Sequence, residues 1–330
     1  MKRLTYFVAI LALIYSGYWA VGSYALKNTV QNQLTTLENN GWLVDYSALN
    51  TRGFPSRFDT TATDLNITAP DQSISYMTDI VQVLALSYRP NHAIIAFAPE
   101  QSLILDGLPI EIASDGLRAS VGVNANTSLS LDAVTAEAKS LQFNLEQGTI
   151  SSLNDALFAM RESSAAPNTY DTYFTSSDIA WPALILGQLP ADNRLPETVD
   201  AATIDAAITL DRPIDRLTLS AWQTDPANLR GVDLRSLSIT WGPFVITGNG
   251  SFTINEAGTP DGTITLTAND WKGILAAAQS LGVISEQYQF MAQSIGETLS
   301  QGDDTLVLPI TVANGNLSIG PLPLGPAPKF

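Results

Sequence analysis

The chain has 330 residues, with 16 basic and 32 acidic side chains, and its net charge is −16. Charged residues make up 15% of the chain, below the roughly 25% that is usual for soluble domains. Because the chain has no Cys, it can form neither a disulfide nor a thiolate zinc site. Its single imidazole, His92, cannot form a two-histidine metal centre, and its acidic balance argues against a nucleic-acid partner. The composition therefore predicts no metal, no cofactor and no nucleic acid.

An uncharged, mostly apolar run extends from Leu4 to Leu26, long enough to cross a hydrocarbon core of about 30 Å as a helix. Lys2 and Arg3 precede it and Lys27 follows it, so the positive-inside rule places the N-terminus in the cytoplasm. Aromatic rings gather in its second half, where they favour a membrane interface: Tyr15, Tyr18, Trp19 and Tyr24. We expect residues 1–27 to anchor the chain in the inner membrane as a single-pass helix, with the body in the periplasm.

The competing interpretation is a cleaved signal peptide, because Ser23 and Ala25 are small residues at a suitable spacing for signal peptidase. The apolar run is longer than the roughly 7–15 residues typical of signal peptides, which favours a retained anchor. Both interpretations export the body of the protein.

Helical spacing continues after the apolar run, with an apolar stripe at Leu26, Val30, Leu34 and Leu37 that we expect to pack on the following domain. Asn39, Asn40 and Gly41 can end this helix. From there the period changes to two, and turn signals separate short alternating segments throughout residues 42–145. This pattern predicts antiparallel β structure in a first half that covers residues 28–190.

One turn in this half, residues 51–55, is surrounded by charged and aromatic side chains: Arg52, Phe54, Arg57, Phe58 and Asp59. Its functional interpretation is a contact for a partner or a lipid headgroup through Arg52, Phe54, Arg57 and Phe58. Its structural interpretation, which we favour, is a turn whose Phe rings close the end of a β layer.

The end of the first half carries helical signals. Ser151 or Ser152 can cap a helix with Leu153, Leu157 and Met160, and Asp178 can begin another. The proline-containing stretch 189–199 is the predicted domain boundary.

The second half, residues 191–330, again alternates, as around Ile204–Leu210. Two helices are expected, one capped by Asp270 and one with apolar residues from Tyr288 to Leu299. Asn314-Gly315 predicts a two-residue hairpin turn between Val307–Ala313 and Asn316–Ile319. Each half thus appears as strands closed by a helix, a pattern typical of two related halves.

Familiar catalytic motifs are missing. There is no Gly-x-Ser-x-Gly elbow, and a triad would have to recruit His92, which we place in a turn. Gly248-Asn249-Gly250 lacks the Lys of a phosphate loop and predicts a bulge or bend. The acidic residues Asp303-Asp304, and Asp211 with Asp215, are predicted to lie in solvated turns. We therefore predict no catalytic residues and no enzymatic activity, with a hydrolase using an unrecognised acid pair as a weaker alternative.

Four segments carry a family resemblance: Gly41–Tyr46, Gly53–Phe58, Ser87–His92 and Gly320–Pro323. With the N-terminal anchor they resemble an uncharacterised family of Gram-negative envelope proteins, known as domain of unknown function 2125. The resemblance implies no activity and no site residues. The order of anchor, helix and long β structure more loosely resembles AsmA-like envelope proteins, which implies a curled sheet with an apolar groove for lipid.

The sequence thus predicts a mainly β (α+β) protein, with a transmembrane helix before an antiparallel, curved sheet and a few packed helices. The leading hypothesis is a non-enzymatic envelope protein that shelters an apolar ligand such as lipid. The alternative is a structural module that binds another envelope protein through an apolar patch or an open edge strand.

Overall fold

The computed structural model describes residues 2–146, 148–180, 196–221, 225–280, 286–300, 302–320 and 322–329. They form two compact units, the first with residues 1–123 and 143–147, the second with residues 124–142 and 148–330. Eighteen antiparallel strands account for most of both units, which confirms the predicted mainly β class. The predicted domain boundary around residue 190 lies outside the described residues.

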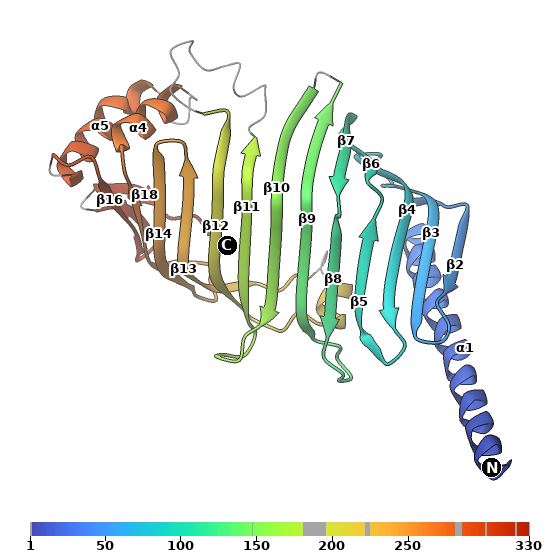
Figure 1. Ribbon diagram of the computed structural model, residues 1–330. Coiled ribbons are helices and arrows are strands. Elements are labelled where there is room, and N and C mark those ends of the chain that lie inside the picture. The colour runs from blue at the N-terminus through green and yellow to red at the C-terminus, as the bar shows by residue number, and fades with distance from the viewer. Residues whose placement is uncertain are drawn as a thin grey trace. The chain divides into compact units, whose positions relative to one another are not determined.

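Unit 1 consists of one long helix beside a set of antiparallel strands (Figure 1). Its elements are α1 (Lys2–Asn39), β1 (Leu43–Asp45), β2 (Ala48–Arg52), β3 (Arg57–Thr68), β4 (Ile74–Leu86), β5 (Arg89–Phe97), β6 (Glu100–Leu105), β7 (Leu108–Asp115) and β8 (Arg118–Val123). The central strand β4 pairs with β3, and then with β6 along its first half and β5 along its second. The turns β2–β3 and β4–β5 therefore lie at one end of the strands, and the β6–β7 turn lies at the other.

The second half of α1 packs along β1, β2 and β3. The predicted stripe, Leu26, Val30, Leu34 and Leu37, is half-buried, as expected for a helix face against a sheet. The helix ends at Asn39, and Gly41 takes the left-handed backbone conformation that follows such an end, with φ of 87°. The helical stripe and its stop signal are thus both confirmed.

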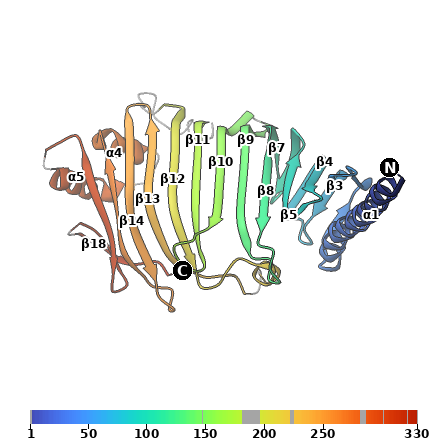
Figure 2. The same cartoon turned by 60° about the horizontal axis from the view of Figure 1, so that its bottom comes forward.

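Unit 2 is an antiparallel meander in which each strand from β9 to β18 pairs with the next (Figure 2). Its strands are β9 (Leu131–Leu145, of which residues 131–142 belong to this unit), β10 (Gly148–Glu162), β11 (Thr169–Ala180), β12 (Thr198–Leu210), β13 (Leu229–Trp241), β14 (Phe244–Ile254), β15 (Pro260–Ala268), β16 (Leu306–Ala313), β17 (Asn316–Ile319) and β18 (Leu322–Pro326). Its described helices are α3 (Arg216–Ser220), α4 (Trp271–Ser280) and α5 (Glu286–Ser300).

The predicted helices in the second half are confirmed. Asp270 accepts a hydrogen bond from the backbone N–H of Gly273 and so caps α4, while α5 follows it. Trp271 is 3% exposed, and Gly296 of α5 lies directly against its ring. The hairpin β16–β17 turns at Asn314 and Gly315, both with positive φ, as the Asn-Gly signal predicts.

The two helices predicted near the end of the first half are wrong. Residues 148–162, expected to begin a helix at Ser151 or Ser152, form strand β10. Asp178, expected to begin a helix, lies inside strand β11. The first half therefore has no helix after its strands at Ser151. The prediction of two related halves, each closed by a helix, depended on that helix.

Candidate functional site

The turn between β2 and β3 is built against α1. The Phe58 ring is 4% exposed, and its centroid lies 6.0 Å from the Trp19 ring of the helix. Phe54 is 57% exposed, and its ring lies edge-to-face with the Trp19 ring, with the two centroids 5.4 Å apart. Both predicted Phe residues therefore contact the helix, and only Phe54 also presents a large surface to the outside.

The two predicted Arg residues lie at the surface of the same turn. Arg57 Nε donates to Asp59 Oδ1 at 3.0 Å, and Arg57 Nη2 lies 3.0 Å from Asp59 Oδ2. Arg52 is exposed, and its Cα lies opposite that of Asp59 in the β2–β3 pair. The structure thus brings Arg52, Phe54, Arg57 and Phe58 together at one strand end.

Three aromatic side chains of α1 donate hydrogen bonds to this strand end. Trp19 Nε1–H donates to the Arg57 carbonyl at 2.8 Å. Tyr15 Oη–H donates to the Pro55 carbonyl at 3.0 Å, and Tyr18 donates to the Ser87 carbonyl. The helix therefore supplies hydrogen-bond donors to carbonyls at both neighbouring turns.

Ser87, between β4 and β5, joins the two turns. Its side chain is fully buried, its N–H donates to the Ser56 carbonyl at 2.9 Å, and its Oγ lies 2.9 Å from Tyr15 Oη. On either side of it, Leu86 and Tyr88 are exposed, the latter by 67%. We call the exposed set Arg52, Phe54, Arg57, Leu86, Tyr88 and Arg89 the strand-end surface. Sequence reasoning missed Leu86, Tyr88 and Arg89, although Ser87–His92 was among the segments singled out.

His92 lies within β5 rather than in a turn, with its Cα opposite Gly122 of β8. Its side chain is exposed. Among the residues that the structure describes, no three His, Asp or Glu side chains are grouped in a way that could hold a metal ion.

A second candidate site is the face of the unit 2 sheet that carries Ile204. Side chains of residues directly opposite one another on paired strands lie on the same face of a sheet. The register of the strand pairs therefore identifies the residues on the Ile204 face. One row across seven strands is Phe158, Phe174, Ile204, Leu237, Gly248, Leu266 and Leu308. The next row along the strands is also mainly apolar, with one hydroxyl side chain, and consists of Met160, Thr172, Ala206, Leu234, Gly250, Ile264 and Ile310. We call this the apolar face.

The opposite face of the same strands is hydroxyl-rich. Its corresponding row is Thr175, Thr203, Ser238, Thr247 and Thr267. Neighbouring hydroxyls bond across the strands, as between Thr175 and Thr203 and between Thr263 and Thr311. The sheet of unit 2 is therefore amphipathic, because one face is mainly apolar while the other carries hydroxyls together with the charged side chains of Arg161, Asp171 and Asp205.

Helices cover one end of the apolar face. Phe244 is 2% exposed beneath α4, where Gly273 contacts its ring, and Leu306 and Ala268 are buried nearby. Farther along the sheet, Phe158 and Ile204 are each 38% exposed, although Phe174 lies between them in the row. Apolar side chains at the centre of a domain normally lose most of this exposure. The middle of the apolar face thus keeps apolar surface that a bound molecule can cover.

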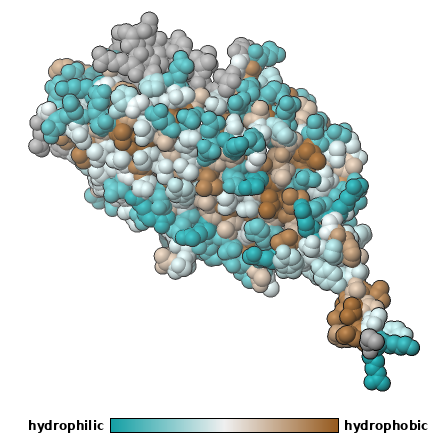
Figure 3. Space-filling model, in the orientation of Figure 1, coloured by the Kyte–Doolittle hydropathy of each residue, from teal (hydrophilic) through white to brown (hydrophobic). Residues whose placement is uncertain are grey.

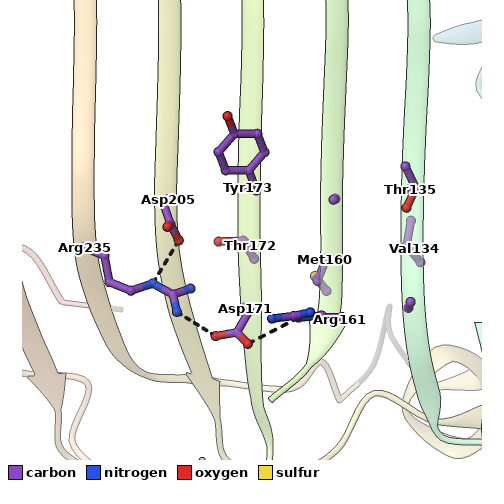
Figure 4. Close-up of a pocket in the computed structure, with 11 residues that line it drawn as sticks. Val134, Thr135, Met160, Arg161, Asp171, Thr172, Tyr173, Asp205 and Arg235 are labelled. Carbon is purple, nitrogen blue, oxygen red and sulfur yellow. Dashed lines mark hydrogen bonds and ion pairs between the residues drawn. The ribbon is translucent and has the colours of Figure 1, made fainter. Parts of the chain in front are cut away.

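Strands β9 to β13 also carry a shallow depression of about 350 Å³, with Arg235 at its edge (Figure 4). Arg235 is the extra residue of an irregularity in β13, and its guanidinium bonds Asp205 Oδ1 at 2.9 Å and Asp171 Oδ1 at 3.0 Å. Arg161 Nε lies 3.5 Å from Asp171. Two carboxylates converge here, and both bind Arg235. The arrangement is an ion-pair chain that links β10, β11, β12 and β13.

The acidic residues near position 211 are also structural. Burial opposes the charge of Asp211, but hydrogen bonds from Asn228 and Arg212 outweigh it and lower its pKa to about 2. Asp215 is buried and caps α3 by accepting bonds from the N–H groups of Leu217 and Thr218, both at 2.9 Å. These residues were expected in solvated turns; instead they fix the connection between β12 and β13.

Comparison with known proteins gives one match. The family described as "Uncharacterized protein conserved in bacteria (DUF2125)" matches residues 19–328. No curated protein and no solved structure matches the chain, so the looser resemblance to AsmA-like proteins has no support from these comparisons.

Proposed function

Since the chain belongs to the uncharacterised bacterial family DUF2125, whose description names no activity, we propose from its geometry a membrane-anchored, non-enzymatic envelope protein that binds lipid on its apolar face. The observation that carries this proposal is the exposure of Phe158 and Ile204, each 38%, within a row that has no polar side chain across seven strands. Burial of apolar surface contributes roughly 25 cal/mol per Å², so acyl chains lying across such a face would bind without any specific polar contact.

The membrane part of the proposal rests on α1. Among the described helices it alone is long and apolar enough to cross a bilayer, and none of its residues is buried. Its free end is hydrophobic and finishes in hydrophilic residues (Figure 3). With Lys2 and Arg3 at that end, the N-terminus would lie in the cytoplasm and the β units in the periplasm, with α1 crossing the inner membrane once.

Contacts of α1 with unit 1 support a retained helix over a cleaved signal peptide. Cleavage after Ala25 would remove Tyr15, Tyr18 and Trp19, and with them the donors to the carbonyls of Pro55, Ser87 and Arg57. It would also uncover Phe58, now 4% exposed. Intact-mass measurement of the protein extracted from membranes distinguishes the two forms directly.

The alternative, a module that binds another envelope protein through an open edge strand, has less support. The terminal strand β18 carries Pro323 and Pro326, which lack the backbone N–H that an added strand would need. Strand β18, at the end of the meander, is therefore poorly suited to pairing with an added strand.

The lipid proposal is tested on full-length protein purified in a non-lipid detergent. Mass spectrometry of solvent extracts should find phospholipid or another acyl-chain lipid in a fixed ratio to protein. The control is a variant with a charge placed on the apolar face, described below. The proposal would be overturned if wild type and variant carried the same amount of lipid per mole of protein, and if that amount equalled the lipid found in detergent micelles without protein.

A further inference from the structure

The apolar run of α1 and its contacts with unit 1 overlap along the helix. A straight crossing of a core of about 30 Å needs roughly 20 residues, so a span that begins at Leu4 reaches the far boundary near Ser23. Yet Tyr15, Tyr18 and Trp19 already bond the turns of unit 1. The part of the helix before Tyr15 covers only about 16 Å, half of the hydrocarbon thickness.

From this overlap we infer that the strand-end surface of unit 1 is immersed in the periplasmic leaflet of the membrane that α1 crosses. Phe54, Leu86 and Tyr88 then lie within the periplasmic leaflet beside the helix. This inference rests on the proposed membrane anchor and adds a second contact with the same bilayer, made by turns rather than by a helix.

The hydrogen bonds of the strand end agree with such a position. Turn carbonyls in a low-dielectric layer are costly unless they have a donor, which is why exposed loops avoid the hydrocarbon region. Here the carbonyls of Pro55, Arg57 and Ser87 each have a donor from α1. The donors are Tyr and Trp, which themselves favour the membrane interface.

The charges of the strand-end surface also suit lipid headgroups. Arg52, Arg57 and Arg89 lie at this end, and Asp59, the acid opposite Arg52, is paired with Arg57. The whole chain, in contrast, carries a net charge of −16. Long Arg side chains can place their guanidinium groups at the phosphate level while the neighbouring aromatic rings lie deeper. This end of unit 1 therefore matches a phosphate-bearing interface better than the average surface of the protein does.

Site-directed spin labelling tests the inference, because the chain has no native Cys that would have to be removed. The full-length protein is reconstituted into vesicles of phosphatidylethanolamine and phosphatidylglycerol. Four single variants are labelled: Leu11→Cys in the free part of α1, Phe54→Cys and Tyr88→Cys in the strand-end surface, and Leu108→Cys. Leu108 is the matched control, because it is exposed and apolar but lies in the β6–β7 turn at the opposite end of the strands.

Power-saturation measurements compare collision with oxygen, which concentrates in lipid, and with a water-soluble nickel complex. Labels at 11, 54 and 88 should collide severalfold less with nickel than the label at 108. If the label at 11 is shielded while 54 and 88 are as accessible as 108, the anchor stands and the inference about the turns is wrong. If the label at 11 is also accessible, the proposed anchor itself fails.

Discussion

Gly22 of α1 lies against the ring of Phe58, so close that a β-carbon at position 22 would come within 2.6 Å of Phe58 Cζ. Phe58 is almost fully buried and has little room to withdraw. A side chain at position 22 would therefore force the Phe58 ring or the helix to shift. The same glycine allows Trp19, one turn earlier, to reach the Arg57 carbonyl.

Replacing Gly22 by Val should separate the helix from the turn. Overpacking of this kind costs about 1–3 kcal/mol, so amide hydrogen exchange in residues 53–59 should accelerate by roughly tenfold or more. Mass-spectrometric exchange in detergent micelles measures this. Gly17→Val is the control, because a β-carbon at Gly17 meets no atom within 4 Å. Equal exchange in both variants would contradict the packing.

Removing the indole donor should expose the turn to protease. Trp19→Phe keeps an aromatic ring but leaves the Arg57 carbonyl without its bond, at a cost of about 1–3 kcal/mol. Tryptic cleavage after Arg57 should then become faster in detergent-solubilised protein. Tyr24→Phe, which alters an exposed ring of the same helix, should leave the cleavage rate unchanged.

A charge on the apolar face should remove bound lipid. Ile204→Asp places a carboxylate in the middle of the row from Phe158 to Leu308, while Thr203→Asp places one on the hydroxyl-rich face next to it. Because Ile204 is partly exposed, the folded state should tolerate both changes. Lipid extracted per mole of protein should fall severalfold for Ile204→Asp only. A parallel fall in both variants would indicate that lipid does not distinguish the two faces.

The two glycines of β14 should differ in their tolerance of Ala. Gly250 has φ of 141°, and a β-carbon there would collide with the Thr263 carbonyl of the paired strand. At Gly248 the nearest atom is the flexible end of Leu266, at 2.7 Å. Gly250→Ala should lower the free energy of unfolding by roughly 2–4 kcal/mol and Gly248→Ala by about 1 kcal/mol. Thermal unfolding followed by near-UV circular dichroism measures both, and equal midpoints would refute the steric argument.

The connection around Asp211 should lose stability in acid. The folded-state pKa of Asp211, about 2, lies below the value of about 3.9 for an unfolded Asp, so the ionised carboxylate adds its full share to the free energy of unfolding above about pH 5. This stabilisation is lost as Asp211 becomes protonated, when the pH falls toward 2. Wild type should exceed Asp211→Asn in stability by about 1–2 kcal/mol at pH 6, and the difference should shrink toward pH 2.5. Urea unfolding at the two pH values tests this; a constant difference would contradict it.

Sequence patterns predicted the elements whose signals are local. The end of α1 at Asn39, the cap at Asp270 and the Asn314-Gly315 hairpin each depend on a few neighbouring residues. Strand β10 shows why other segments were misread. Two register shifts and a positive φ at Asp155 interrupt its alternation. The interruptions space Leu153, Leu157 and Met160 as a helix would, although the backbone is extended.

The candidate sites depend on contacts that the sequence does not encode locally. The turn at Arg52–Asp59 was recognisable from its residue types, and the structure buries Phe58 against Trp19 and Gly22 of α1. That Tyr15, Tyr18 and Trp19 would reach this turn and Ser87 could not be predicted, because the partners are 38 to 72 residues apart. The apolar face likewise follows from the pairing of strands, which the alternation in each strand leaves open.

The helix α1 runs unbroken from its apolar end to Asn39, and it packs on strands β1, β2 and β3 of unit 1. A flexible linker after a membrane span lets a domain tumble and search a large volume. In α1 no flexible linker separates the apolar segment from the part that packs on unit 1, so the helix connects the two rigidly. If α1 crosses the bilayer, unit 1 is held at a fixed depth and in a fixed orientation relative to it. A molecule leaving the leaflet would then always meet the same side of the protein first.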